Sequence, residues 1–476
     1  MADAFGKSPV HAVLPNEDSR SYQSVRFRPI SRVKRVEFGR LLRQDVSRAS
    51  LGQWRRDDNR LDPIAQIVRS HDGRLASLIP VRVGRMVSSP YGFLRGATVV
   101  MTHDLSRLPA TGITPVICGD AHLGNFGFYA SPERDLVIDL NDFDEAHPGP
   151  WEWDLRRLVT SIWVAGRLNG STEAQCDESV TACAAAYRES IRFLANQPLL
   201  WRSFQRLNVD QLHATVTDKS LRTTIARAVE LARTRTSDRT LPRLTTVRGA
   251  RRRIIDQPPL LTRVSRTDAQ RISLALDNYL VTLAPHWRRV VAGYTVVDIA
   301  HKVVGVSSVG LRSYIALLEG SSPDDVLFLQ LKQARRSVVA RYVHGDSARH
   351  AHQGQRVVEY QQALQTVSDP LLGWTTIDGL SYYVRQFRDM KGTVPVDAIK
   401  ARALTDYAGI LGRLLAKGHA RTSGASMIAG YLGASDRLDV AMSRFARAYA
   451  DQIEADHAAL VRAVAQGVLP SEASGS

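Results

Sequence analysis

Acidic and amide side chains follow two apolar stretches of the chain, at the point where each stretch ends. Asp120 and Asn125 come after Thr114–Cys118, and Asp142 comes after Leu136–Leu140. Short apolar runs that end in turn residues are typical of buried strands. Phosphoryl transfer needs an oxygen acceptor beside the attacking hydroxyl and hard oxygen ligands for Mg²⁺. We therefore expect Asp120 to serve the hydroxyl, and Asn125 and Asp142 to bind the metal.

Neighbouring polar residues extend both groups. Asp139 and Asp144 compete with Asp142 as metal ligands, and Asp144 is favoured as the helper because alternate residues of an extended chain share a face. His122 joins Asp120 in the expected catalytic set, where its imidazole would support the loop rather than carry a proton. A single aspartate after a strand is more often a turn or cap residue, but two such groups in this order are harder to explain by turn chemistry.

A glycine-containing segment much later in the chain forms a second group. Gly305, Ser307 and Gly310 have the spacing of a G-x-G-x-x-G loop, with serine in the middle place. Their apolar, β-like flanks predict a strand–loop–strand hairpin rather than a strand–loop–helix unit. Backbone N–H groups at such a tip, including that of Ser308, can bind phosphates.

The elements after the hairpin complete this second group. Val326–Lys332 is predicted to be a strand that ends in a lysine, as in kinases, where the lysine holds the α- and β-phosphates. Glu359, in a helix that begins near Gln355, is expected to pair with Lys332. Taken alone, this lysine would more often be a surface residue, but the order of hairpin, lysine and glutamate favours a nucleotide site.

The first group of residues resembles the catalytic apparatus of a known enzyme group. Gly119–Asn125 resembles the Gly-Asp-x-His-x-x-Asn loop of the aminoglycoside and choline kinases, and Asp142–Ala146, followed by Asp154, resembles their metal-binding segment. The resemblance implies ATP and Mg²⁺ as cofactors and a structural role for Asp154. Cys118 stands where those kinases commonly have a histidine, which keeps a nucleotide-binding pseudokinase open as an alternative.

A closer resemblance is to a bacterial domain-of-unknown-function family, number 2252. It extends from about Arg40 to Gly433 and implies a protein-kinase-like fold without naming a substrate. The segments that carry it are Ser89–Gly96, Cys118–His122, Asn141–Glu145 and Pro148–Asp154.

The order of the two groups is unusual for a kinase, because the glycine hairpin, Lys332 and the expected linker Arg388–Gly392 follow the catalytic aspartate. A circular permutation explains this order, and folds tolerate permutation when the original termini lie close together. We expect an α+β, protein-kinase-like, two-lobed fold with a mostly helical catalytic lobe and a smaller antiparallel-sheet nucleotide lobe. Thr405–His419 would be a helix packing beneath the catalytic loop. Two unrelated domains are the alternative.

The predicted organisation divides the chain into successive parts. They are an N-terminal helical and extended segment (1–75), the catalytic-lobe core (76–200), a basic connection (201–290), the nucleotide-binding small lobe (291–392) and C-terminal helices (393–476). Within the first two, Leu78–Arg85 is predicted to be a strand or an extended segment, and Tyr91–Leu105 a helix. Three arginines there, Arg82, Arg85 and Arg95, are expected either to bind phosphate or carboxylate groups or to pair with nearby aspartates.

Composition narrows the protein class. The formal net charge of +16 favours acidic partners, although arginine-rich composition can also arise without a binding role. The segment Leu221–Arg266 is rich in arginine. We expect it to face solvent or to lie against acidic residues of the protein itself, and nucleic-acid binding is a less favoured alternative. We predict a cytoplasmic protein for three reasons. The chain has few cysteines, no apolar run long enough to span a membrane, and a polar N-terminus.

The sequence therefore predicts an ATP- and Mg²⁺-dependent phosphotransferase acting on a hydroxyl acceptor that its motifs do not identify. Transfer of AMP instead of phosphate, nucleotide binding without transfer, and nucleic-acid binding through the arginine-rich segment are the alternatives. Oligomeric state is not predicted.

Overall fold

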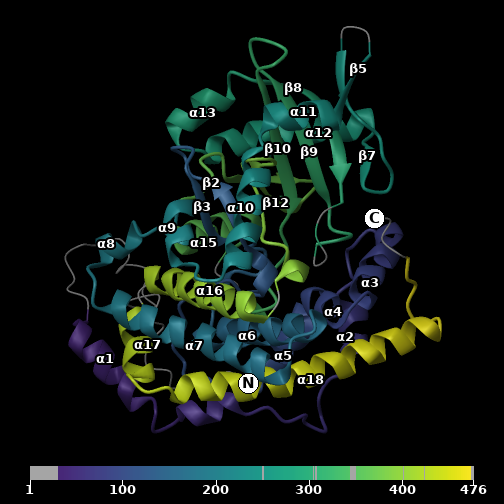
Figure 1. Cartoon of the computed structure of the whole chain (residues 1–476). Helices are drawn as coiled ribbons and strands as arrows, with labels where there is room; N and C mark the ends of the chain where they lie inside the picture. Colours follow the sequence, from purple (N-terminus) through teal and green to yellow (C-terminus); the bar gives the residue numbers. More distant parts are fainter. Residues whose placement is uncertain are drawn as a thin grey trace.

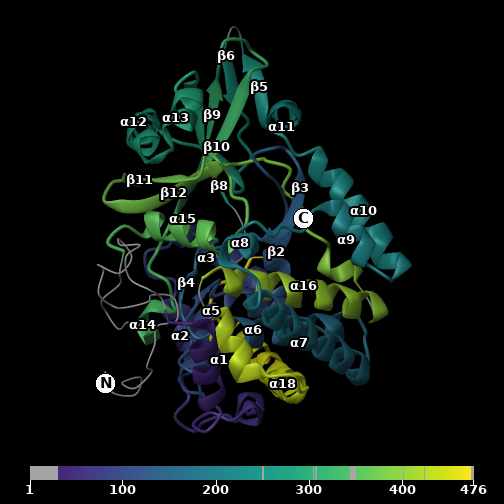
Figure 2. The ribbon, with the colours of Figure 1, turned by 90° about the vertical axis from the view of Figure 1, so that its left-hand side faces the viewer.

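The chain forms a mixed α+β fold in which a large helical part lies beneath a smaller part built around an antiparallel sheet (Figure 1). The structure is a computed structural model that describes residues 30–472, except for 249–250, 304, 306–307, 344–349, 400 and 423. In the side view of Figure 2, the early helix α1 (Arg32–Leu41) and the late helix α18 (Arg437–Ala465) lie near each other at the bottom of the molecule.

The helical part combines the first half of the chain with its last three helices. Besides α1 and α18, its helices are α2 (Pro63–Arg69), α3 (Ile79–Val87), α4 (Pro90–Gly96), α5 (Thr98–Ser106), α6 (Trp151–Leu168), α7 (Glu173–Ala195), α8 (Leu199–Ser203), α9 (Val209–Thr215), α10 (Lys219–Arg233), α16 (Ala401–Arg421) and α17 (Ala425–Leu432). Its strands form two antiparallel pairs, β1 (Val116–Ile117) with β4 (His147–Pro148) and β2 (Phe126–Ala130) with β3 (Leu136–Leu140).

The sheet part is continuous in sequence from about residue 237 to 386. Its helices are α11 (Ser237–Leu244), α12 (Arg266–Thr282), α13 (Pro285–Val291) and α15 (Gln353–Leu364), whereas α14 (Ala340–Val343) packs on the core of the helical part. Its strands are β5 (Thr245–Arg248), β6 (Arg251–Ile254), β7 (Leu261–Arg263), β8 (Thr295–Lys302), β9 (Ser313–Glu319), β10 (Val326–Gln333), β11 (Gly373–Ile377) and β12 (Leu380–Gln386). The main sheet has the order β11-β12-β10-β9-β8-β7, and every neighbouring pair is antiparallel.

One hydrophobic core joins the two ends of the chain within the helical part. Leu51 and Leu469 both belong to it. Helix α16 lies so close to α7 that a Cβ atom at Gly412 would be 2.2 Å from the backbone oxygen of Cys183, which only glycine permits. This packing brings a helix from residues 401–421 beneath strands formed near residue 120.

The alternation of side chains on β10 decides which way Lys332 points. Leu329 and Leu331 pack with α12 on one face of the sheet, whereas Phe328 packs with α11 and β6 on the other. Successive side chains of a strand point to opposite faces, so Lys332 shares the face of Phe328. Its side chain is therefore directed away from α12.

The predicted strand or extended segment Leu78–Arg85 is wrong, because this stretch is the helix α3. Its apolar residues Val81 and Met86 are buried. A short apolar run does not distinguish a strand from a buried helix, and Pro80 in the first turn favours the helix.

Other predicted elements near the catalytic loop differ in extent. The single helix expected over Tyr91–Leu105 is two helices, α4 and α5, which meet at Ala97. The residues directly after Asn125 form β2, a strand that was not predicted, and it pairs with β3. The strand expected over Thr114–Cys118 is reduced to the two residues of β1.

The arginine-rich segment includes α10, which packs on the core of the helical part, and α11, the β5–β6 hairpin and β7 of the sheet part. Arg252 pairs with Glu319 at 3.1 Å and Arg253 with Asp298 at 3.4 Å, so some of its charge meets the protein's own acids. All three cysteines are free and buried. Over the part of the chain that the structure describes, no helix combines the length and the apolar character needed to cross a membrane.

Candidate functional site

The catalytic loop leaves β1 through a turn that requires glycine. Gly119 has a φ of 74°, and a Cβ atom there would lie 2.3 Å from the backbone oxygen of Glu145. The carboxylate of Asp154, in the first turn of α6, accepts bonds from the backbone N–H groups of Cys118 and Gly119 at 2.6 and 2.9 Å. Asp154 therefore fixes the loop that presents Asp120, which is a structural role of the kind that the resemblance implied.

Helix α16 supports Asp154 from the other end of the chain. His419 Nε2 lies 3.3 Å from Asp154 Oδ2, and its Nδ1 lies 2.8 Å from the hydroxyl of Tyr187 on α7. His419 is fully buried. The expected helix beneath the catalytic loop is thus present, and a histidine in its last turn makes the contact with Asp154.

Asp120 is a buried carboxyl that faces one cation. Arg157 on α6 donates from Nε to Asp120 Oδ1, while its Nη2 donates to Leu94 O and Thr98 Oγ1. Burial raises the pKa of Asp120 to about 7 although Arg157 opposes the rise, and the nearby acids Glu145 and Asp142 add to it. No hydrogen bond to Oδ2 of Asp120 is present within the described residues, so this oxygen remains open to a ligand.

The other two predicted residues of the loop make contacts within it. Asn125 donates from Nδ2 to Asp120 O at 2.7 Å, and His122 Nδ1 accepts from Gly124 N at 3.1 Å. Burial holds the pKa of His122 well below its usual range, so its imidazole is neutral at physiological pH. His122 therefore stabilises the loop, as its position predicted.

Lys332 meets the aspartates that follow β3. Its Nζ lies 2.6 Å from Asp144 Oδ2 and 3.5 Å from Asp142 Oδ1, and the hydroxyl of Tyr383 on β12 donates to Asp144 Oδ1 at 2.9 Å. Although burial opposes ionisation of both groups, their mutual attraction raises the pKa of Lys332 and lowers that of Asp142. Residues far apart in sequence thus form one charged cluster.

The donor set suits a small hard cation that also binds a phosphate. Asp142 Oδ1 is buried and has no hydrogen-bond partner within the described residues. Asp139, the competing ligand, pairs with Lys417 of α16 instead. No group of three or more His, Cys, Asp or Glu side chains gathers like a metal cage in the part of the chain described. Mg²⁺ is commonly held by one or two carboxylates together with substrate phosphates, so Asp142 and Asp144 fit it. Asn125, the third predicted ligand, bonds to Asp120 O instead and is not among the residues that line the cavity.

The predicted pairing of Lys332 with Glu359 is wrong. Glu359 binds His350 Nε2 at 2.6 Å and Gln355 Nε2 at 2.7 Å on the outer side of α15. The inner side of this helix carries Arg356, which donates to the backbone of the 144–146 segment. Glu359 therefore does not belong to the candidate site.

The glycine hairpin forms between β8 and β9, as expected. Ser308 is buried, Gly310 has a φ of 88°, and Gly310 O accepts a bond from Leu75 N at 2.8 Å. Gly305 is also described, whereas the predicted Ser307 lies outside the described residues. The tip of the hairpin is thus held by the segment before α3.

The three arginines before the catalytic loop do not pair with aspartates. Arg82 Nη2 donates to Gly96 O at 2.8 Å, and Arg85 donates to Gly305 O in the hairpin. Neither these two nor Arg95 forms an ion pair within the described residues. The ion-pair alternative is therefore not observed.

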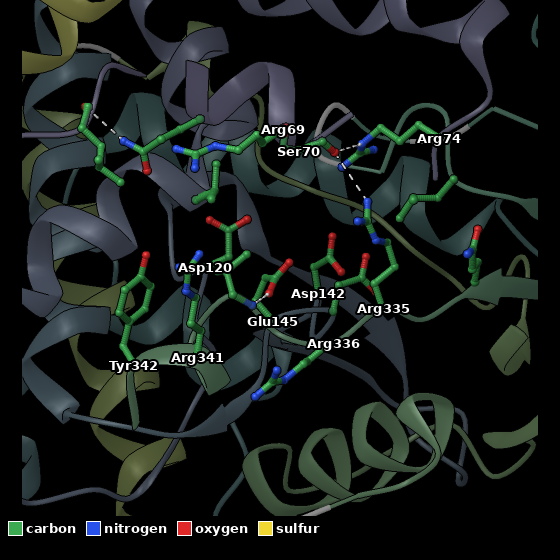
Figure 3. Close-up of a pocket in the computed structure, with 17 residues that line it drawn as sticks. Arg69, Ser70, Arg74, Asp120, Asp142, Glu145, Arg335, Arg336, Arg341 and Tyr342 are labelled. Carbon is green, nitrogen blue, oxygen red and sulfur yellow. Dashed lines mark hydrogen bonds between the residues drawn. The ribbon is translucent and has the colours of Figure 1, made fainter. Parts of the chain in front are cut away.

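A cavity of about 290 Å³ lies where the two groups meet (Figure 3). Its acidic lining residues are Asp120, Asp142, Asp144 and Glu145. Its arginines are Arg69, Arg74, Arg335, Arg336 and Arg341. Lys332 reaches this cavity through its ion pairs with two of the acids. The site thus combines the expected acidic groups with a lining of arginines that the sequence motifs did not indicate.

Arg157 and His419 are the structural supports that sequence reasoning missed. Arg157 follows Asp154 closely in a helix with many apolar residues, and this was a usable signal because a buried arginine requires an acidic or carbonyl partner. His419 gave no local signal, since its partner Asp154 is far away in the sequence.

Comparison with known proteins identifies a family but no characterised relative. No curated protein and no solved structure matches the chain. A family of uncharacterised proteins conserved in bacteria, DUF2252, matches residues 74–463, which include the catalytic loop, the aspartate segment, the hairpin and Lys332. The chain belongs to the DUF2252 family.

Proposed function

We propose that this protein is an ATP- and Mg²⁺-dependent phosphotransferase that acts on a hydroxyl acceptor. The observation that carries the proposal is the meeting of Lys332, Asp142 and Asp144 beside the cavity that Asp120 also lines. A lysine, metal-binding carboxylates and a group that receives the acceptor proton are the parts that phosphoryl transfer requires.

The order of elements in the sheet part supports a permuted protein-kinase-like, two-lobed fold. The glycine hairpin β8–β9, the lysine strand β10 and the helix α15 follow one another in the order that kinases use. The hairpin is next to β10 in the sheet. Helix α16, which comes after β12, returns to the catalytic loop through His419.

On the acceptor side, Asp120 would orient the hydroxyl through its open Oδ2 while Arg157 holds Oδ1. A pKa of about 7 suits a group that accepts a proton near neutral pH. In the proposed reaction the hydroxyl oxygen bonds to the γ-phosphorus, the bond to the β–γ bridging oxygen breaks, and the hydroxyl proton passes to Asp120. ADP and a phosphate monoester are the products.

On the nucleotide side, Asp142 would hold Mg²⁺ with Asp144 as helper, and Lys332 would hold the phosphates. Mg²⁺ would neutralise charge on the β- and γ-phosphates. Lys332 is bound to both aspartates, so ligand binding must replace part of this ion pair with bonds to phosphate oxygens. Chain groups thus contribute mainly positioning and electrostatic stabilisation.

Calorimetric titration of the full-length protein with a non-hydrolysable ATP analogue tests the proposal. Binding should require Mg²⁺ and should weaken at least about tenfold in Asp142→Asn, because charged hydrogen-bonded contacts are lost. Asp135→Asn is the matched control, since this exposed aspartate lies just before the same strand. Nucleotide binding that is independent of Mg²⁺, or equal in Asp142→Asn and wild type, would contradict the proposal.

A transfer assay then distinguishes transfer of the γ-phosphate from transfer of AMP. ATP labelled at the γ-phosphate should label an acceptor, whereas label at the α-phosphate should stay with the nucleotide. Transfer of the α-label would assign AMP transfer to the same residues instead.

A further inference from the structure

Four of the five arginines that line the cavity form two pairs by position. Arg69, at the end of α2, and Arg341, in α14, both act electrostatically on the hydroxyl of Tyr342. In Figure 3 their side chains lie on either side of the Asp120 carboxylate. These two arginines therefore belong to the acceptor side of the candidate site.

Arg74 and Arg335 belong to the opposite side. Arg74 acts electrostatically on Arg335 and is attracted by Glu145 and Asp144. Its Nη1 also donates to Val309 O in the glycine hairpin at 2.5 Å. This second group thus lies with the proposed nucleotide phosphates.

Arg69 and Arg341 form no ion pair within the described residues, although both line a cavity with acids on its wall. The carboxylate that lies between them, that of Asp120, already pairs with Arg157. Guanidinium groups bind phosphate and carboxylate oxygens in a bidentate manner. An anionic group of a substrate can therefore supply the partner that Arg69 and Arg341 lack within the described residues.

We propose that the acceptor is a small hydroxyl compound that carries a phosphate or carboxylate group, and that Arg69 and Arg341 bind this group. The inference rests on the proposed function, since it names the class of the second substrate. A cavity of about 290 Å³ that also admits the γ-phosphate limits the acceptor to a few carbon atoms. Cationic acceptors, such as choline and aminoglycosides, are disfavoured by the same arginines.

Titration of the full-length protein, with and without Mg²⁺ and a non-hydrolysable ATP analogue, tests this assignment. Glycerol 3-phosphate and glycerate are the anionic probes, and glycerol and choline are the uncharged and cationic comparisons. At least one anion should bind more tightly than glycerol and choline. Its affinity should fall about tenfold or more in Arg69→Gln and in Arg341→Gln. The affinity of the ATP analogue should change less than about twofold.

Arg289→Gln is the matched control, because it removes an equal charge from the exposed surface of α13. Retained anion affinity in this variant, together with loss in Arg69→Gln, supports the acceptor site. The inference is overturned if neither anion binds, or if both bind equally well to Arg69→Gln and wild type. If the ATP analogue does not bind, the proposed function is overturned. Anion binding that is lost in Arg69→Gln would still show an anion site at Arg69, so the two failures are distinguishable.

Discussion

Replacement of Arg157 by methionine would remove the cation that holds the candidate catalytic carboxyl. The side chains of Arg157 and Asp120 are 3% and 8% exposed, so water shields their pairing little. Loss of one partner from such a buried pair costs about 3–5 kcal/mol of folding free energy when the other partner stays charged. Asp120 is charged above its pKa of about 7. The loss should therefore be larger at pH 8 than at pH 5.

The direction of this pH dependence follows from the two states of Asp120. Its pKa is raised from 3.8 in the unfolded chain to about 7 in the folded protein. Its contribution to stability is therefore complete below pH 4 and is lost as the pH rises through 7, by about 4 kcal/mol in total. Arg157 opposes this rise in pKa. Without it the loss becomes larger and continues to higher pH.

Urea unfolding of the full-length protein at pH 5 and pH 8 measures the effect. Arg289→Met, an exposed replacement of the same kind, should change the free energy of unfolding by less than about 0.5 kcal/mol at either pH. The double variant Arg157→Met/Asp120→Asn should recover most of the loss at pH 8, because no buried charge is left unpaired. Equal losses at both pH values, or a double variant as unstable as the sum of the single ones, would refute the reasoning.

Three further predictions use other groups. Lys332→Met should weaken binding of the ATP analogue at least about tenfold in calorimetry while leaving the far-ultraviolet circular dichroism spectrum unchanged; unchanged affinity would exclude a phosphate role. Asp139→Asn should instead lower the unfolding midpoint without changing nucleotide affinity, because Asp139 pairs with the buried Lys417 and does not line the cavity. Loss of nucleotide affinity in Asp139→Asn, with none in Asp142→Asn, would make Asp139 the metal ligand in place of Asp142. The native protein should show almost no thiol reactive with Ellman's reagent and three after denaturation, because all cysteines are buried and burial raises their pKa; rapid reaction of the native protein would contradict this burial.

Elements with strong local signals were predicted closely from the sequence. Strand β3 coincides with the predicted Leu136–Leu140, and β10 contains the predicted Val326–Lys332. The helix expected over Thr405–His419 lies within α16. Each of these has a continuous apolar run or a helical apolar period, which local sequence determines well.

Weak or short signals gave the errors. Leu78–Arg85 alternates in a way that fits a strand or a helix, and packing of α3 in the core selected the helix. Lys332 and Glu359 were paired because of their order, but the face that α15 turns inward carries Arg356. The orientation of a helix depends on which of its sides packs against the neighbouring core, and spacing along the chain does not determine it.

The sequence by itself determined the chemical groups of this protein: acids and an amide after two strands, a glycine hairpin and a strand lysine. Only the tertiary structure decided which of them meet. Lys332 pairs with Asp142 and Asp144, and His419 supports Asp154, across separations of about two hundred residues or more. Local spacing sets side-chain type and direction, but contacts between distant segments arise from the packing of a shared core. The arginines around Asp120 converge for the same reason.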